Sequence, residues 1–192
     1  MKLRAPGENP RKSVLLIVSF GNLDLEQFRD SLEAAGTIYR LEPRILTTPL
    51  FVQPKISLIE RQRKQLEAKK IIGSFRDALR NVEEKWRVAL VVTNYDIYAG
   101  ETNFVFGLAN PQEAIAILST ARLIQWEEGI TPSKIKERIL KEAAHEVGHL
   151  ANLTHCENAA CLMFFSNDLN GVDSKLPVLC DCCKRSLRMN GR

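Results

Sequence analysis

The residues with the clearest chemical meaning in this chain are its three histidines. His145, His149 and His155 all lie within eleven consecutive residues of the 192. Two histidines four residues apart, with a glutamate directly after the first, are typical of a helix that binds zinc. Residues at this spacing share one face of a helix, so both imidazoles can reach the same ion. Glu146 would lie about 100° round the helix from His145, where its carboxylate can reach a water on the metal.

The third histidine can join the site only if the chain turns back after the helix. Asn152 stands at the position where that turn is needed. After glycine, asparagine is the residue that most readily adopts the positive φ of a helix C-terminus. A sharp turn there would bring His155 toward the metal. We therefore expect His145, His149 and His155 to bind one zinc ion, with the fourth coordination position open to water.

A zinc site of this kind predicts hydrolysis. The metal lowers the pKa of its water toward about 7, and Glu146 would accept the proton as general base while the water attacks a carbonyl. The simpler alternative is an ordinary exposed helix that carries histidine and glutamate by chance. The presence of every histidine of the chain in one short window favours the metal site.

All five cysteines follow the histidines. Cys156 and Cys161 form one pair and Cys180 and Cys183 a second, with eighteen residues between the pairs. That spacing is typical of a structural zinc held by four thiolates. Such a site would stabilise a segment with little apolar core of its own. Cys182 is the alternative to Cys183, which we prefer because Cys180 and Cys182 are too close together for a zinc knuckle. A redox or disulfide role is the competing hypothesis.

The composition is that of an ordinary globular protein, 45% apolar and 26% charged, with a formal net charge of +4. Residues 1–12 lack the apolar core of a signal peptide, and no stretch approaches the roughly 18 apolar residues of a membrane span. We expect a cytoplasmic monomer with reduced cysteines, no membrane contact and no nucleic-acid partner. The basic clusters at residues 61–70 and 184–192 leave a zinc-stabilised nucleic-acid binder as a further hypothesis, but no recognised binding motif accompanies them.

Apolar runs alternate with helical patterns along the chain, which predicts an α/β (α+β) fold. We predict strands over residues 13–19, 38–46, 88–93, 103–109 and 114–120, and helices over residues 23–35, 58–86 and 132–151. Thr131 can cap the last helix and Pro132 fits its first position. We divide the chain into a tail (residues 1–12), an α/β subdomain ending in the zinc-binding helix (residues 13–152) and a small irregular lobe held together by a second zinc (residues 153–192).

The segment from residue 145 to residue 183 resembles the archaemetzincin family, a branch of the metzincin zinc peptidases. The resemblance rests on the histidines with Glu146, on the two cysteine pairs, and on Met163 two residues after Cys161. Residues 104–109 are also similar to that family. The resemblance implies that Met163 lies in a turn beneath the metal as a support and not a ligand. It also implies a twisted mixed sheet whose edge strand, residues 103–109, would pair with an extended peptide. The alternative for this strand is ordinary packing within the sheet.

Two positions depart from the family pattern. Asn152 stands where the family has glycine, so a turn that requires glycine would misplace His155 and weaken metal binding. Some metzincins place a tyrosine after the methionine, whereas here Phe164 and Phe165 follow and cannot donate a hydrogen bond to an oxyanion. Tyr95 and Tyr98 are only remote substitutes.

We therefore predict a zinc metallopeptidase that acts on peptide or protein substrates and carries two zinc ions per chain, one catalytic and one structural. The alternative is a catalytically weak or inactive zinc module that binds peptides or protein partners. Because His155 and Cys156 are adjacent in the sequence, loss of the structural zinc should disturb the catalytic one.

Overall fold

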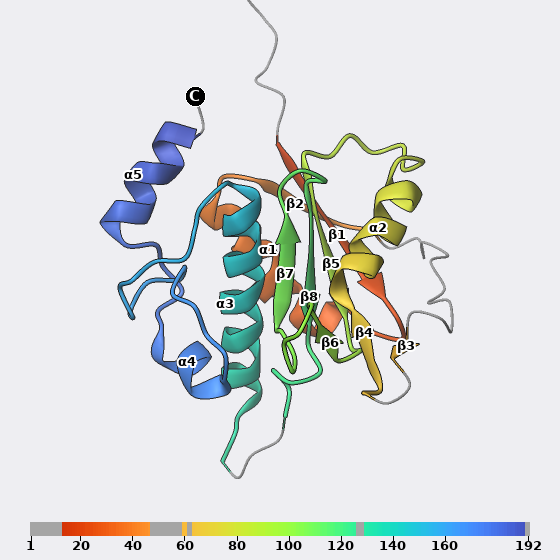
Figure 1. Ribbon diagram of the computed structural model, residues 1–192. Helices are drawn as coiled ribbons and strands as arrows, with labels where there is room; N and C mark the ends of the chain where they lie inside the picture. Colours follow the sequence, from red (N-terminus) through yellow and green to blue (C-terminus); the bar gives the residue numbers. More distant parts are fainter. Residues whose placement is uncertain (1–12, 47–58, 61–62, 126–128, 191–192) are drawn as a thin grey trace, which may run out of the picture.

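The centre of the molecule is a twisted five-stranded sheet. The computed structural model describes residues 13–46, 59–60, 63–125 and 129–190. The strand order is β2-β1-β5-β8-β7; neighbouring strands are parallel except β7, which runs antiparallel to β8 at the edge (Figure 1). The strands are β1 (Val14–Phe20), β2 (Glu42–Ile45), β5 (Val88–Thr93), β7 (Gly107–Asn110) and β8 (Ile115–Ser119). The predicted mixed sheet with helices is confirmed.

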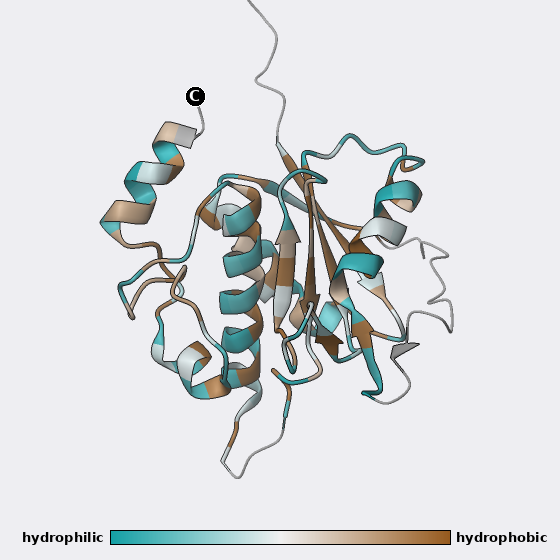
Figure 2. Cartoon of the chain, viewed as in Figure 1, coloured by the Kyte–Doolittle hydropathy of each residue, from teal (hydrophilic) through white to brown (hydrophobic). Residues whose placement is uncertain are grey.

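Helices cover both faces of this sheet. On one face lie α1 (Arg29–Ile38) and α3 (Pro132–Leu150), and on the other lies α2 (Ala68–Leu79). In β1, Leu15 and Ile17 belong to the core beneath α1 and α3, whereas Leu16 and Val18 belong to the core beneath α2. Successive strand residues point to opposite faces, so an uninterrupted apolar run serves both cores. Figure 2 shows the resulting hydrophobic centre of the sheet between more hydrophilic outer helix faces.

The predicted edge strand over residues 103–109 forms only in part. Regular pairing with β8 begins at Gly107 and ends at Asn110. Before it, Val105 makes an isolated antiparallel bridge to Ile97. The segment nevertheless ends at the sheet edge, because β7 is the last strand of the order.

The predicted long helix over residues 58–86 forms only in part, as α2 (Ala68–Leu79). Residue 58 lies outside the described residues, and the next part of the segment forms a small sheet instead of a helix. That sheet consists of β3 (Ile59–Glu60), β4 (Gln65–Glu67) and β6 (Ile97–Tyr98). Lys64 has a positive φ of 55°, which interrupts a helix, and β4 pairs with β6 from later in the chain. Strand pairing between distant segments therefore overrides the helical pattern before residue 68.

The helix predicted over residues 23–35 is shifted toward the C-terminus. A short 3-10 turn, η1 (Glu26–Phe28), precedes α1, and α1 continues past Gly36. A Cβ at Gly36 would lie 3.1 Å from Cδ2 of Leu15, so this glycine lets the helix pack closely on β1 instead of ending it. The turn after the helix is made by Arg40, whose φ is 57°.

The zinc-binding helix predicted over residues 132–151 is α3. The Thr131 side chain accepts a hydrogen bond from the backbone N–H of Lys134 at 3.2 Å, as predicted for an N-terminal cap. Beyond α3, the segment predicted to be irregular contains α4 (Leu169–Ser174) and α5 (Asp181–Asn190). The division at residue 152 stays a prediction, and the tail of residues 1–12 lies outside the described residues. Among the described residues, no helix is both long and apolar enough to cross a membrane.

Candidate metal centre

α3 directs two imidazoles to one point. His145 and His149 lie one helical turn apart, and their Nε2 atoms are separated by 3.1 Å. The side chain of His145 is buried, and that of His149 is half-buried. This is the arrangement expected for residues four apart on a helix.

The chain turns back directly after α3. Asn152 has a φ of 60°. Its backbone N–H donates to the carbonyl of His149 at 2.9 Å, and the N–H of Leu153 donates to the carbonyl of Gly148 at 3.0 Å. These two bonds form the Schellman ending of a helix, in which the residue with positive φ is usually glycine. The predicted turn at Asn152 is confirmed, and asparagine adopts it here.

The turn brings His155 back to the two helix histidines. The centre of its ring lies 5.3 Å from that of His145 and 4.9 Å from that of His149. One ligand nitrogen from each of the three residues lies within 4.8 Å of the others. The three side chains thus form a group that could hold a metal ion, with His155 on its exposed side.

Backbone carbonyls orient the two helix histidines. Nδ1 of His145 lies 3.0 Å from the carbonyl oxygen of Leu162, and Nδ1 of His149 lies 2.8 Å from that of Leu153. A carbonyl oxygen only accepts, so each Nδ1 carries the proton and each Nε2 presents its lone pair to the shared point. Burial lowers the pKa of His145 to about 3 and also lowers the pKa of His149 and His155. All three imidazoles are therefore neutral at neutral pH, as metal ligands must be.

Glu146 packs against the start of β7. A Cβ at Gly107 would lie 2.6 Å from Cδ of Glu146, so only glycine leaves room for this carboxylate. The Glu146 side chain is buried, and its Oε2 has no hydrogen-bond partner among the described residues. Burial, with a further contribution from the nearby Glu142 carboxylate, raises the pKa of Glu146 well above its usual value. A carboxylate in such surroundings has a strong affinity for a proton.

Met163 is fully buried. A Cβ at Gly148 would lie 2.4 Å from the Met163 sulfur and 2.5 Å from the Tyr39 hydroxyl, so this glycine of α3 allows both to pack against the helix. The Tyr39 hydroxyl donates to the carbonyl of Ala144 at 2.8 Å. Met163 therefore packs against α3. Its place in a turn beneath a metal, as the family resemblance implies, stays a prediction.

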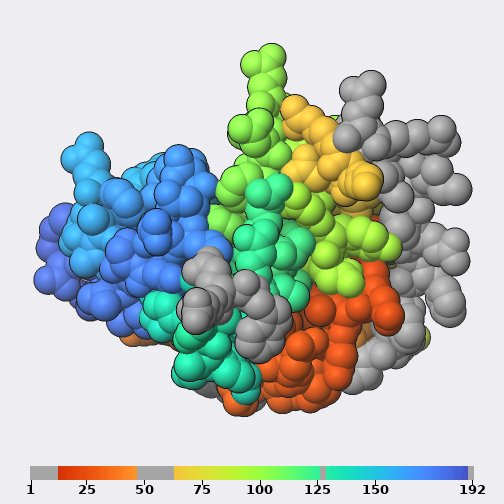
Figure 3. Space-filling model, turned by 90° about the horizontal axis from the view of Figure 1, so that it is seen from below, coloured from red at the N-terminus to blue at the C-terminus, as the bar shows by residue number. Residues whose placement is uncertain are grey.

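A cavity of about 820 Å³ opens in front of these residues. Residues 102–109 and 111 line it together with the three histidines, Glu142, Glu146 and residues 152–154 and 165–167. Figure 3 shows the hollow between the C-terminal segment, in blue, and the segment near residue 105, in green. The rings of Phe104 and Phe106 meet edge to face with their centres 5.2 Å apart, so one wall is apolar and runs into the free edge of β7.

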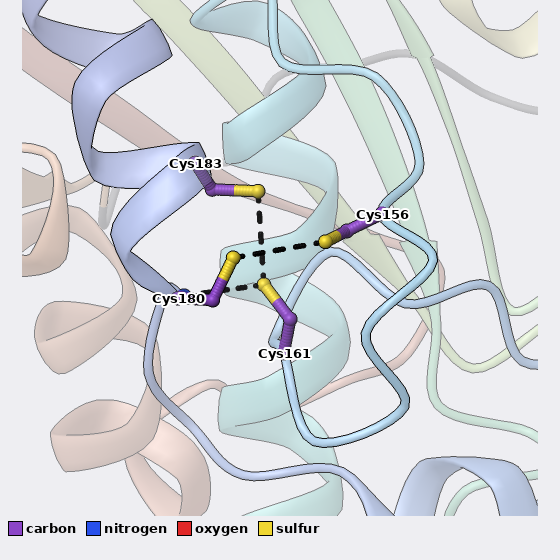
Figure 4. Close-up of side chains that lie close together, drawn as sticks. All are labelled: Cys156, Cys161, Cys180 and Cys183. Atoms are coloured by element: carbon purple, nitrogen blue, oxygen red, sulfur yellow. Dashed lines mark hydrogen bonds between the residues drawn. The ribbon is translucent and has the colours of Figure 1, made fainter.

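The four predicted cysteines also converge (Figure 4). The sulfur of Cys156 lies 3.7 Å from that of Cys180, and the sulfur of Cys161 lies 3.7 Å from that of Cys183. All four sulfurs lie within 4.8 Å of one another, a group that could hold a second metal ion. A hydrogen bond from the backbone N–H of Cys183 is the main cause that lowers the pKa of Cys180 to about 7. Cys182 is exposed and lies outside this group.

The sequence model of peptidase family M54 matches residues 31–189, which include both groups of candidate ligands. The chain belongs to peptidase family M54. The resemblance to the archaemetzincins that the sequence suggested is thereby confirmed, because curated relatives carry that name. The archaemetzincin of Pyrococcus abyssi is 45% identical over 106 residues, or 54% of this chain and 56% of the relative. This M54 chain thus spans just over half the length of the curated relative in that alignment.

Solved structures match the M54 chain over nearly its whole length. The crystal structure of archaemetzincin from Methanopyrus kandleri superposes with a TM-score of 0.80 at 29% identity, covering 95% of this chain and 98% of that one. A zinc-dependent peptidase from Methanocorpusculum labreanum superposes with a TM-score of 0.76 at 25% identity, covering 90% and 99%. The twisted mixed sheet and the helices around it are therefore those of this family.

Three features of this M54 site were not predicted from the sequence. Tyr39 comes from the end of α1, 105 residues before the carbonyl that it binds. Lys175 is fully buried, and its Nζ lies 2.6 Å from Oε1 of the buried Glu142 on α3. Gly107 makes room for Glu146. A buried lysine and a buried glutamate leave no local signal, because each looks like a surface residue until its partner is known.

Proposed function

We propose that this chain is a zinc metallopeptidase in which His145, His149 and His155 bind the catalytic zinc and Glu146 acts as general base. One observation carries the proposal. Three imidazole nitrogens converge within 4.8 Å at the wall of a cavity, and a buried carboxylate with an unpartnered oxygen, among the described residues, lines the same cavity. Membership of family M54 supports the reaction class, as does the relative from Methanocorpusculum labreanum, described as a zinc-dependent peptidase.

The geometry of the histidines fits a zinc ion. Zn–N distances near 2.0–2.1 Å in a tetrahedral site require ligand nitrogens about 3.3 Å apart. The Nε2 atoms of His145 and His149 are 3.1 Å apart, close to that value. The carbonyls that hold Nδ1 of both rings supply the outer hydrogen bonds usual for zinc histidines. Three protein ligands leave one position open, as in catalytic zinc sites.

Each part of the proposed site has a separate role in hydrolysis. Zinc, when bound, supplies a Lewis acid that polarises a carbonyl and makes water a better nucleophile. Glu146 accepts the proton of the attacking water at its unpartnered Oε2 and passes it to the departing amine. Burial raises the pKa of this carboxyl, and a higher pKa makes its carboxylate a stronger base. Phe104 and Phe106 give the cavity an apolar wall beside these groups.

The substrate we propose is an extended peptide or protein segment. β7 is the edge strand of the sheet among the described residues, and Gly107, Leu108 and Ala109 line the cavity. An edge strand offers backbone N–H and carbonyl groups that can pair with an added chain. Pairing there would place a peptide bond beside Glu146, which packs against Gly107.

We propose a second, structural zinc at Cys156, Cys161, Cys180 and Cys183. Four sulfurs at the corners of a tetrahedron around zinc lie about 3.8 Å apart when Zn–S is 2.3 Å. The S···S distances of Cys156–Cys180 and Cys161–Cys183 are both 3.7 Å, far longer than the roughly 2.05 Å of a disulfide. Four thiolates hold zinc only when reduced, which supports the cytoplasmic location expected from the sequence. The monomeric state also remains a proposal.

The decisive test of the catalytic proposal is Glu146→Gln. This change keeps the shape of the side chain but removes the proton acceptor. We expect zinc content to be unchanged and hydrolysis of a mixed peptide library to fall by about 10²–10⁴-fold. Glu157→Gln, which alters an exposed glutamate next to Cys156, is the matched control and should retain full activity.

The non-catalytic alternative has one observation in its favour. No tyrosine lines the described part of the cavity, so the oxyanion lacks the phenolic donor that some metzincins provide. If the zinc-loaded parent protein binds library peptides but cleaves none of them, the peptide-binding module is the correct reading. Cleavage by Glu146→Gln at the parent rate would instead contradict the role of this residue.

A further inference from the structure

A second cavity, of about 750 Å³, lies between the ends of α1 and α3, the start of β5, and α5. We call it the basic groove, lined by residues 38–41, 87–88, 147, 150–152, 177–179, 184 and 187–188. It lies near the upper side of the molecule in Figure 1, where α3 ends next to α5. None of the candidate metal ligands lines it. Its only shared residue with the metal-site cavity is Asn152.

The charge of the basic groove has one sign. Arg40, Arg87, Lys184 and Arg188 line it, and no aspartate or glutamate does so among the described residues. All four cationic side chains belong to exposed residues. Within the described part of the chain, Lys184 pairs with the carboxylate of Asp181 at 3.7 Å. The three arginines have no carboxylate partner there. The positive potential of the groove is therefore largely uncompensated.

The floor of the basic groove is apolar. Leu150 and Leu179 are buried at its base, Leu187 is half-buried on α5, and Val178 remains 51% exposed. A concave apolar floor with charged groups at its rim is the usual form of a binding site. The shape does not suit a flat membrane surface. The complementary ligand is a chain that carries both acidic and apolar side chains.

We propose that the basic groove docks an acidic segment of a partner polypeptide, whose apolar side chains contact Val178 and Leu187. The N-terminal segment of the chain itself is a poor occupant on charge, because residues 1–12 contain Lys2, Arg4, Arg11 and Lys12 against the single Glu8. An external acidic segment matches the groove in both charge and polarity.

The groove also extends the proposed substrate site. Since Asn152 borders both cavities, a polypeptide docked in the groove can continue past the end of α3 toward the histidines. This second step rests on the proposed peptidase function, whereas docking itself does not. The substrates expected from this second step are proteins with an acidic segment adjacent to the cleaved bond.

Docking is tested by fluorescence anisotropy with a labelled peptide built from glutamate, leucine and valine. The zinc-loaded Glu146→Gln protein is used so that cleavage does not interfere. We expect the glutamate peptide to bind, its lysine counterpart not to bind, and affinity to fall with added salt. The double change Arg87→Glu/Arg188→Glu should weaken binding by roughly tenfold.

The control variant is Lys69→Glu/Lys136→Glu. It makes the same change in net charge at two exposed lysines outside the groove, and it should leave binding unchanged. Val178→Asp places a carboxylate on the half-exposed floor and should weaken binding without affecting the fold, which circular dichroism checks. Equal affinity for all these variants, or no binding of the glutamate peptide, overturns the proposal. Adsorption to phosphatidylserine vesicles without peptide binding would assign the groove to lipid and equally overturn it.

A kinetic comparison tests the substrate step. An acidic extension on one side of a cleavable peptide should lower KM several-fold in the parent protein, and Arg87→Glu/Arg188→Glu should remove that advantage. The turnover of the short peptide should be the same in both proteins. Absence of any hydrolysis refutes the proposed peptidase but leaves the anisotropy result standing, whereas an extension without effect on KM refutes the substrate step alone.

Discussion

At the scale of single residues, the site depends on two glycines, because neither position has room for a side chain. Gly107 and Gly148 lie where a Cβ would collide with Glu146 and with Met163, respectively. The first glycine leaves room for the proposed base, and the second lets the methionine and Tyr39 approach α3. Neither has a positive φ. Close packing, and not backbone freedom, explains why glycine is needed at both positions.

Gly107→Ala should impair catalysis more than folding. The new methyl carbon would lie only 2.6 Å from the present position of the Glu146 carboxylate carbon, so it would displace that carboxylate. A shift of about 1 Å in a catalytic group can reduce the rate by roughly 10²-fold. We expect a loss of that order in kcat/KM with normal zinc content. Gly73→Ala, in α2 with no atom within 4 Å of the added methyl, is the control and should leave activity intact. Equal activity of both variants would contradict the placement of Glu146.

At the scale of elements, the end of α3 determines where the third histidine lies. Asn152 carries the positive φ, and the carbonyl of the next residue, Leu153, orients His149. The helix ending therefore positions two of the candidate ligands. It directs the chain to His155 and supplies a hydrogen bond to a ring on the helix itself.

The effect of a substitution at position 152 should depend on how easily the new residue adopts a positive φ. Asn152→Gly retains the turn, so zinc affinity and stability should stay close to those of the parent. Asn152→Val places a β-branched residue at positive φ, which costs about 1–2 kcal/mol or more and pulls His155 away. Zinc titration and urea unfolding measure the two effects. Equal zinc affinity in the valine variant would show that His155 does not depend on this turn.

A second connection between elements is the buried ion pair of Lys175 and Glu142. Lys175 follows α4, Glu142 lies on α3, and both side chains are almost fully buried. Lys175→Met would leave a buried carboxylate without its cation, a change that destabilises by about 3–5 kcal/mol. The double change Glu142→Gln/Lys175→Met should recover much of that loss. Urea unfolding measures the stability of the parent and of both variants. If Lys175→Met is as stable as the parent, the ion pair contributes little to stability.

At the scale of the whole molecule, the two groups of candidate ligands are adjacent along the chain. His155 belongs to one group and the next residue, Cys156, to the other. The segment from Cys156 to Met163, which includes Cys161, is closed by a hydrogen bond from the N–H of Cys156 to the carbonyl of Met163, the methionine that packs against α3. A change in the position of the cysteines should therefore also move His155, which directly precedes Cys156 along the chain.

Cys180→Ser should show this coupling. It removes one thiolate of the proposed structural zinc, so we expect a loss of zinc, a melting temperature lower by roughly 10 °C, and weaker zinc binding at the histidines. Cys182→Ser alters an exposed cysteine outside the group and should change nothing. Metal analysis and thermal unfolding measure both variants. Full zinc content in Cys180→Ser would contradict the four-cysteine site.

The sequence by itself determined the features that depend on near neighbours. The spacing of His145 and His149, the cap at Thr131, the turn at Asn152 and the buried apolar strands were all predicted, because helix geometry and backbone preferences act over a few residues. The grouping of Cys156, Cys161, Cys180 and Cys183 was also predicted, from their spacing and chemistry.

Only the tertiary structure decided the features that depend on distant segments. β4 pairs with β6 where a helix was predicted, Tyr39 reaches α3 from 105 residues away, and Lys175 finds its carboxylate across the fold. The basic groove likewise collects its cations from α5 and from segments that follow α1 and precede β5. Local propensities carry no information about which remote residues will meet, since that depends on how the layers pack.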